Sequence, residues 1–262
     1  MYAVTAQVEE AWRVLLEQLT RTAGVPLDYL PYPAPQPLEA LWARHDVGAV
    51  LMCGYPIAQR LAAVVPLAAP VPDVPWAQGR AVYRTDLIVR ADAPYRTLAD
   101  TFGARAGWTV AHSQSGFNAF RHELLPYRSA QRPALYAEML GNLVTARNVL
   151  DSVRDGRIDV GPLDAYWHLL IARHAPQLTA GVRVLCSTPL TPMPAFVAAA
   201  GAPPEMIAGL RAAFQGAARQ PWFPALARAL LLQGFAPVEA ADYDLLLQWD
   251  REARAAGLTE PR

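Results

Sequence analysis

The chain alternates short apolar runs with amphipathic segments, and this alternation constrains its fold more than any other feature. Residues 47–52 are continuously apolar, as in a strand that is covered on both faces. Residues 80–90 alternate β-branched with polar side chains and predict a longer strand, whereas residues 8–19 have the apolar spacing of a helix. Strands that alternate with helices of about 10–15 residues indicate βαβ units. The sequence therefore predicts an α/β fold with mostly parallel strands.

The most regular α/β pattern occupies the middle of the chain, and the segments on either side look incomplete alone. The length of 262 residues allows one large domain or two of ordinary size, about 150 residues each. An economical arrangement is a discontinuous lobe one, built from 1–84 and 187–262, with lobe two inserted at 85–186. The chain then crosses between the lobes twice.

The composition excludes intrinsic disorder and several kinds of chemistry. Hydrophobic residues make up 53% of the chain and charged residues 18%, which is enough apolar surface for a sizeable core. The 23 basic residues are all arginine, so Schiff-base and P-loop lysines are excluded. They balance 23 acidic residues, and a neutral chain without basic runs is a poor ligand for nucleic acid. We therefore expect no nucleic acid partner.

Neither the cysteines nor the start of the chain indicates a metal centre, a leader or a membrane span. Cys53 and Cys186 lie far apart in apolar stretches without a CxxC pair, so they are either buried thiols or one disulfide. No charged segment followed by an apolar run begins the chain, and prolines interrupt the apolar residues 47–75. As written, the chain is expected in the cytoplasm, or in the periplasm if a leader was lost upstream. We expect no metal.

The most informative window is a strand at 105–110 that runs into a serine- and glycine-containing turn before a helix. The turn contains Ser113, Gln114, Ser115, Gly116 and Asn118. Free N–H groups at a helix start carry partial positive charge, and serine hydroxyls add donors, so such a turn can bind an oxyanion without lysine. The alternative is an ordinary serine cap followed by a glycine that allows close packing. Both interpretations stay open.

Four further positions could contribute to the same ligand site. His112 either donates to the anion or is an ordinary half-buried histidine. Asp164 follows a predicted strand and either caps the next helix or receives a ligand amine. Tyr166 lines the site or packs in the core, and Tyr55, after the apolar strand, offers a hydroxyl or packs normally.

No familiar catalytic or cofactor motif occurs in the sequence. HExxH, GxSxG and GxGxxG are absent, and the Ser-Gln-Ser-Gly turn lacks the glycine that precedes a nucleophilic serine by two residues. We therefore predict no catalytic residue and no cofactor.

Four segments together carry a resemblance to a known family. They are Cys53-Gly54-Tyr55-Pro56, 83–89 (YRTDLIV), 113–118 (SQSGFN) and 156–166 (GRIDVGPLDAY). In order and spacing the chain resembles the PhnD-like phosphonate, phosphate and phosphite substrate-binding proteins of ABC transporters, within the type 2 periplasmic binding proteins. The resemblance covers nearly the whole chain and is clearest over 45–200.

The resemblance implies a fold, a function and a set of ligand contacts. The fold is two α/β lobes hinged by two crossings, which close on a small anion or zwitterion for uptake through an ABC permease; we expect a monomer. The implied contacts are the Ser113–Gly116 turn on the anion oxygens, Tyr55 from the opposite lobe, Asp164 on a ligand amine, Thr145 on the anion and Tyr83 near the ligand.

One position departs from the family pattern. Gln114 stands where the familiar turn has a threonine, which removes one hydroxyl donor and favours a bulkier or uncharged ligand as an alternative to phosphonate. A cytosolic enzyme or a ligand sensor on the same fold is the alternative function, with His112 or Asp164 as the general base of an enzyme.

Overall fold

The computed structural model describes residues 2–262 and divides the chain into two compact units. Unit 1 comprises Met1–Tyr83 and Pro192–Asp244, and unit 2 comprises Arg84–Thr191 and Leu245–Arg262. The chain thus passes between units three times, whereas two crossings were expected. Within residues 2–262 no helix combines the length and the apolar character that crossing a bilayer requires.

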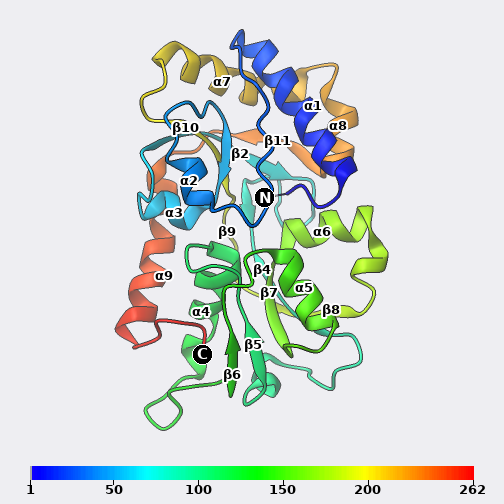
Figure 1. The fold of residues 1–262 in the computed structure, drawn as a ribbon, viewed down its shortest axis with the longest axis vertical. Helices are drawn as coiled ribbons and strands as arrows, with labels where there is room; N and C mark the ends of the chain where they lie inside the picture. The colour runs from blue at the N-terminus through cyan, green and yellow to red at the C-terminus, as the bar shows by residue number, and fades with distance from the viewer. Residues whose placement is uncertain (1) are drawn as a thin grey trace. The chain divides into compact units, whose positions relative to one another are not determined.

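Unit 1 is a four-stranded sheet, in the order β1-β10-β2-β11, with helices packed against it. Helix α1 begins at the cap Thr5, whose side chain accepts from Val8 N, and ends at Gly24 in the left-handed conformation. It packs on α7 and α8, which in turn contact β11 (Figure 1). The elements of the unit are α1 (Ala6–Ala23), α2 (Leu38–Trp42), β1 (Val50–Met52), α3 (Gly54–Ala58), β2 (Val64–Pro72), β3 (Val82–Tyr83), β10 (Ala195–Ala199), α7 (Pro204–Gly216), α8 (Phe223–Leu230), β11 (Leu232–Ala236) and the 3₁₀ turn η6 (Ala240–Tyr243).

The predicted parallel pairing is wrong for unit 1. Strand β10 pairs antiparallel with both β1 and β2, and β11 pairs antiparallel with β2. The reason is the interleaving of the chain: β1 and β2 come from the first segment of the unit, whereas β10 and β11 come from the second and run the other way. A local sequence pattern carries no information on that direction.

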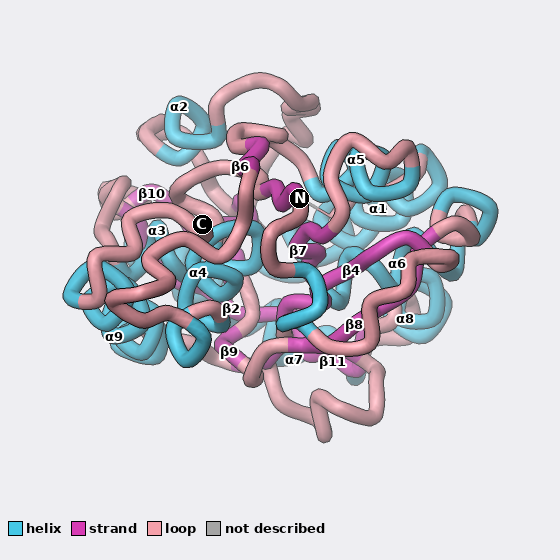
Figure 2. The backbone as a smooth tube through the Cα atoms, turned by 90° about the horizontal axis from the view of Figure 1, so that it is seen from below, coloured by secondary structure: helices cyan, strands magenta, loops and turns pink. Residues whose placement is uncertain are grey.

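Unit 2 contains a mixed five-stranded sheet in the order β6-β5-β7-β4-β8, of which β7, β4 and β8 can be followed side by side in Figure 2. Strand β5 is parallel to β6 and β7, whereas β4 is antiparallel to β7 and β8. The carboxyl ends of β5, β6, β7 and β8 therefore lie at the same edge as the amino end of β4. The elements of the unit are β4 (Thr85–Arg90), β5 (Arg105–Gly107), a π-helical turn η2 (Gln114–Asn118), α4 (Ala119–Glu123), β6 (Glu138–Leu140), α5 (Ala146–Arg154), β7 (Val160–Asp164), α6 (Ala165–His174), β8 (Val182–Ser187) and α9 (Asp244–Ala255). The short strand β9 (Thr191–Pro192) pairs with β3 in a separate two-stranded sheet.

The C-terminal segment differs from the expected domain division. Residues 245–262 were expected in lobe one with the rest of 187–262, but they belong to unit 2. The physical reason is a buried ion pair, in which Arg121 of α4 meets Asp250 of α9. The amphipathic pattern of α9 shows that it needs a partner, without showing which unit provides it.

An aromatic cluster forms part of the core of unit 1. Phe214 of α7 lies with its ring centroid 5.0 Å from Phe196 of β10 and 5.0 Å from Phe235 of β11. All three side chains are buried. The cluster joins the helix layer to strands from both sides of β2.

We expect Phe214→Ala to lower the free energy of unfolding by about 3–5 kcal/mol, because it leaves a cavity among buried rings. Urea denaturation followed by circular dichroism measures this loss. Leu30→Ala, at a side chain of the same unit that is 51% exposed, is the control and should change stability by less than about 0.5 kcal/mol. Equal effects of the two substitutions would contradict the packing described here.

Candidate ligand-binding site

Three helical segments begin at one edge of the unit 2 sheet. The turn η2 follows β5, helix α5 follows β6, and helix α6 follows β7. Because these three strands are parallel, their carboxyl ends bring the three helix starts to the same edge. Backbone N–H groups at helix starts carry partial positive charge, so this edge favours an anion.

The first helix start is the serine turn. Ser113 Oγ accepts from Gly116 N at 2.9 Å, and Ser113 O accepts from Asn118 N at 3.0 Å. Ser113 is therefore a helix cap, as one of the two sequence interpretations proposes. Ser115 is buried, and Thr85 Oγ1 donates to its carbonyl at 3.1 Å. No hydrogen bond within residues 2–262 uses the Ser115 hydroxyl, which leaves that group available to a ligand.

Gly116 allows the turn to approach Thr109 closely. A Cβ at position 116 would overlap the side chain of Thr109, whose backbone N–H donates to Gly116 O at 3.2 Å. Thr109 O in turn accepts from Val144 N at 3.1 Å, which joins this loop to the one before α5. The Thr109 hydroxyl is buried and has no hydrogen-bond partner in the described part of the chain. Such a group is costly unless something bound satisfies it.

Gln114 and Asn118 are fully buried, at the two ends of the π-helical turn. Asn118 Nδ2 donates to Gln114 Oε1 at 2.8 Å and to Leu246 O at 3.0 Å. The amide oxygen of Gln114 is thus engaged by a neighbouring side chain. The Gln114 side chain therefore makes its contact inside the protein, within the π-helical turn.

Thr145 starts the second helix. Its Oγ1 accepts from Asn148 N at 3.1 Å, and its backbone N–H donates to Leu143 O at 2.8 Å. The side chain thus caps α5 at the sheet edge where η2 begins.

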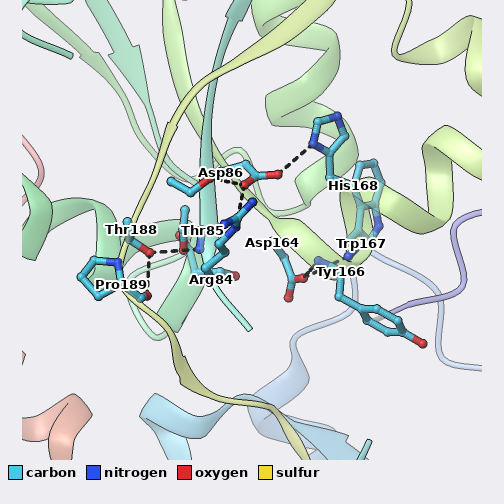
Figure 3. Close-up of polar contacts among 11 residues, drawn as sticks. Arg84, Thr85, Asp86, Asp164, Tyr166, Trp167, His168, Thr188 and Pro189 are labelled. Carbon is cyan, nitrogen blue, oxygen red and sulfur yellow. Dashed lines mark hydrogen bonds and ion pairs between the residues drawn. The ribbon is translucent and has the colours of Figure 1, made fainter. Parts of the chain in front are cut away.

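Asp164 starts the third helix (Figure 3). Its Oδ1 accepts from Tyr166 N at 2.9 Å and from Trp167 N at 3.0 Å, so the carboxylate caps α6. In the antiparallel register Asp164 lies opposite Thr85, which also contacts the serine turn. The Tyr166 side chain is fully buried, and burial followed by the nearby Asp164 charge raises the pKa of its phenol well above the usual value.

Two threonines at this edge were not among the predicted residues. Thr85 N donates to Thr188 Oγ1 at 3.1 Å, and Thr188 N donates to Thr85 O at 2.9 Å (Figure 3). Both side chains are buried. Thr85 lies within the segment 83–89 that carries the family resemblance, and this signal was sufficient to predict its hydroxyl as a site group. Nothing in the local pattern points to Thr188, because only the pairing of β4 with β8 places it there.

Several polar side chains contact Asp86, which follows Thr85 in β4 and so lies on the opposite face of that strand. Ser187 Oγ donates to Asp86 Oδ1 at 2.7 Å, and His168 Nδ1 lies 3.1 Å from Oδ2 (Figure 3). Arg84 Nε lies 3.6 Å from Oδ1. Ser187 and His168 therefore each contact the Asp86 carboxylate. A nucleophilic serine is instead activated by a direct hydrogen bond to a histidine.

The remaining predicted residues are placed as follows. Tyr55 in α3 and Tyr83 in β3 are buried in unit 1, and the Tyr83 hydroxyl lies 3.8 Å from Cys53 Sγ. His112 is half-buried directly before the serine turn in unit 2. Cys53 and Cys186 form no disulfide within residues 2–262, and burial raises the pKa of Cys186 to about 11.

No cluster of His, Cys, Asp and Glu side chains suited to a metal ion occurs within residues 2–262. What the site offers instead is helix-start amides, hydroxyls and one carboxylate. These groups are suited to binding an oxyanion, or a zwitterion with an additional amine.

Comparison with known proteins points the same way. A family model described as the periplasmic substrate-binding protein of the phosphonate ABC transporter matches residues 3–243. A comparison with curated proteins finds no match.

Three solved structures illustrate the likeness in fold. A binding protein component of an ABC phosphonate transporter from Pseudomonas aeruginosa has a TM-score of 0.81 at 15% identity, over 97% of this chain and 84% of that one. PhnD1 from Prochlorococcus marinus, in complex with methylphosphonate, has a TM-score of 0.79 at 14% identity, over 95% and 94% of the two chains. A Xanthomonas citri protein bound to chloride has a TM-score of 0.66 at 23% identity, over 95% and 92%. At these identities the likeness shows the fold alone.

We expect Gly116→Ala to destabilise unit 2 by about 1–3 kcal/mol, because the new methyl group overlaps Thr109 and forces the serine turn apart. Thermal and urea denaturation measure the loss. Gly201→Ala is the matched control, since a Cβ there meets no atom within 4 Å. Thr109→Ala in the Gly116→Ala background should restore part of the stability. If Gly116→Ala is as neutral as Gly201→Ala, the close approach of the turn to Thr109 is not required.

Proposed function

Because this chain belongs to the family of periplasmic substrate-binding proteins of phosphonate ABC transporters, we propose that it captures a small phosphonate- or phosphate-like anion or zwitterion for uptake. A solute-binding role is the role of the family. The observation that carries the choice of ligand is the convergence of three helix starts with buried hydroxyls at one edge of the unit 2 sheet.

The donors at this edge account for anion binding without lysine. Each helix start favours an anion by about 0.3–1 kcal/mol at an exposed site, and by more where water is excluded. The Ser115 and Thr109 hydroxyls are buried with hydrogen-bonding capacity that an oxyanion would use. Thr145 begins the neighbouring helix. A tetrahedral oxyanion offers enough acceptor oxygens for all of them.

Asp164 extends the proposal to zwitterions. Its carboxylate is buried, accepts from two backbone N–H groups at the start of α6, and carries a negative charge that would attract a cation. A ligand amine would supply that cation. We therefore include aminoalkylphosphonates in the ligand class.

The partner and location follow from the family. Proteins of this family are periplasmic once exported and deliver their ligand to an ABC transporter, and we propose a permease partner for this chain acting as a monomer.

We propose four further ligand contacts. Tyr55 and Tyr83 belong to unit 1, and His112 and Tyr166 belong to unit 2. An enzyme or a sensor would be distinguished by turnover or by the lack of a permease partner.

We expect a melting-temperature increase with phosphate, phosphite or alkylphosphonates, and none with aminopyrimidines. At a ligand concentration of one hundred times Kd the stabilisation is about 2.7 kcal/mol. A thermal-shift panel that also includes alkylsulfonates measures this. If no oxyanion raises the melting temperature, the proposed ligand class is wrong.

We expect Ser115→Ala to weaken methylphosphonate binding about tenfold, because it removes one hydroxyl donor at the anion. Titration calorimetry gives the Kd. The control is Ser129→Ala, whose exposed hydroxyl accepts only from Arg132 N in the same unit. Unchanged binding by Ser115→Ala would remove this hydroxyl from the site.

We expect wild-type protein to bind an aminoalkylphosphonate more tightly than methylphosphonate, and Asp164→Asn to abolish that preference. Asparagine caps a helix nearly as well as aspartate, so the start of α6 is preserved while its charge is removed. The ratio of the two Kd values, by titration calorimetry, is the measurement. A ratio that is the same in both proteins would show that Asp164 acts only as a cap.

A further inference from the structure

Helix α9 lies outside the residues that establish the family, since the matched region ends at 243 and α9 spans Asp244–Ala255. It nevertheless packs against the serine turn of unit 2. Leu246, in the first turn of α9, accepts from Asn118 Nδ2 at 3.0 Å, and Asn118 is the last residue of the π-helical turn η2.

The contact is supported by a buried ion pair one turn further along α9. Arg121 of α4 is completely buried and pairs with Asp250 of α9. Asp250 also pairs with Arg254, whose Nε lies 2.8 Å from Oδ2. The Arg121 guanidinium lies 5.0 Å from the ring centroid of Phe117, another residue of the turn. A buried arginine of this kind is tolerable only while its carboxylate partner is in place.

Arg121 in turn fixes the orientation of the Asn118 amide. Arg121 Nη2 donates to Asn118 Oδ1 at 2.8 Å, so the amide oxygen faces α4. The Asn118 NH₂ group then faces Leu246 O and Gln114 Oε1, at 3.0 and 2.8 Å. The amide oxygen thus accepts from a donor and the NH₂ group donates to two acceptors. In the reversed amide the NH₂ group would face the Arg121 donor and the oxygen would face the two acceptor oxygens.

Gln114 and Asn118 are the first and last residues of η2, so their hydrogen bond spans the turn. Ser115 and Gly116, which belong to the proposed anion site, lie between them. A π-helical turn is an uncommon conformation that is held by its surroundings, and such turns are frequent at functional sites. The chain of contacts from Asp250 through Arg121 and Asn118 to Gln114 supplies those surroundings.

We propose that α9 is a structural part of the anion site: through Asp250, Arg121 and Asn118 it holds Gln114 and the π-helical turn in the shape that binds the oxyanion. The four side chains are positioning residues that act on the ligand through the turn. This inference rests on the proposed function for its binding consequence, whereas the coupling of α9 to the turn exists without a ligand.

The coupling is tested first in the ligand-free protein. Hydrogen exchange followed by mass spectrometry reports on backbone amides of peptides that cover 109–120. We expect Asp250→Asn, and independently Gln114→Met, to increase exchange in these peptides about tenfold or more. Glu252→Gln is the matched control, because it makes the same acid-to-amide change on α9 at a carboxylate that pairs with His122 outside the network.

Binding is tested with methylphosphonate and inorganic phosphate by titration calorimetry, well below the melting temperature of each variant. We expect Asp250→Asn and Gln114→Met to weaken binding roughly tenfold, and Glu252→Gln to leave the Kd unchanged. A purely structural role would lower the melting temperature and leave the Kd of the folded protein as it was. If Asp250→Asn does not fold, Gln114→Met decides the question, since it keeps the buried ion pair and replaces the amide by a side chain of similar size.

The outcomes separate the two proposals. If neither variant changes exchange at 109–120 or the Kd, or if Glu252→Gln has the same effect as Asp250→Asn, the inference is overturned. If wild-type protein binds neither probe, the proposed function fails, and the exchange experiment still decides whether α9 holds the turn.

Discussion

The parallel pairing of β5 with β6 and β7 is the constraint on which the candidate site depends. Parallel strands end at a common edge, and each of these three is followed by a helical segment that begins there. The partial charges of three helix starts therefore add in one place. Strand β4 runs the opposite way, which brings its first residue, Thr85, to the same edge, opposite Asp164 and in contact with Ser115 O. In a chain without lysine, these backbone N–H groups are donors that an anion can use.

The polar groups at this edge divide into two kinds. Ser113, Thr145 and Asp164 accept from backbone N–H groups and so stabilise the helices that they begin. The Thr109 hydroxyl is buried without a hydrogen-bond partner within residues 2–262, and an unsatisfied buried hydroxyl costs about 1–3 kcal/mol. A buried hydroxyl without a partner lowers the stability of the fold, and such departures from a fully satisfied interior are typical of functional sites.

The sequence predicted elements whose signals are local. The apolar spacing at 8–19 indicated a helix, and these residues lie in α1 with most of their apolar side chains buried. Pairing direction in unit 1 could not be predicted, because strands on either side of an inserted unit meet in ways that no local pattern records. The placement of α9 failed for a similar reason, since it depends on Arg121 meeting Asp250 across 129 residues. Thr188 reaches the site edge only through the pairing of β8 with β4.

Gln114 stands at the position where the family resemblance implies a threonine. Read alone, the loss of a hydroxyl favours a larger or uncharged ligand. In the structure the Gln114 amide oxygen accepts from Asn118, inside a network that reaches α9. The anion-binding character of the turn comes mainly from backbone N–H groups, which every residue type at position 114 provides except proline. The Gln114 side chain therefore contributes to the turn through its contact with Asn118, and the proposed oxyanion ligands depend on the other donors of the turn.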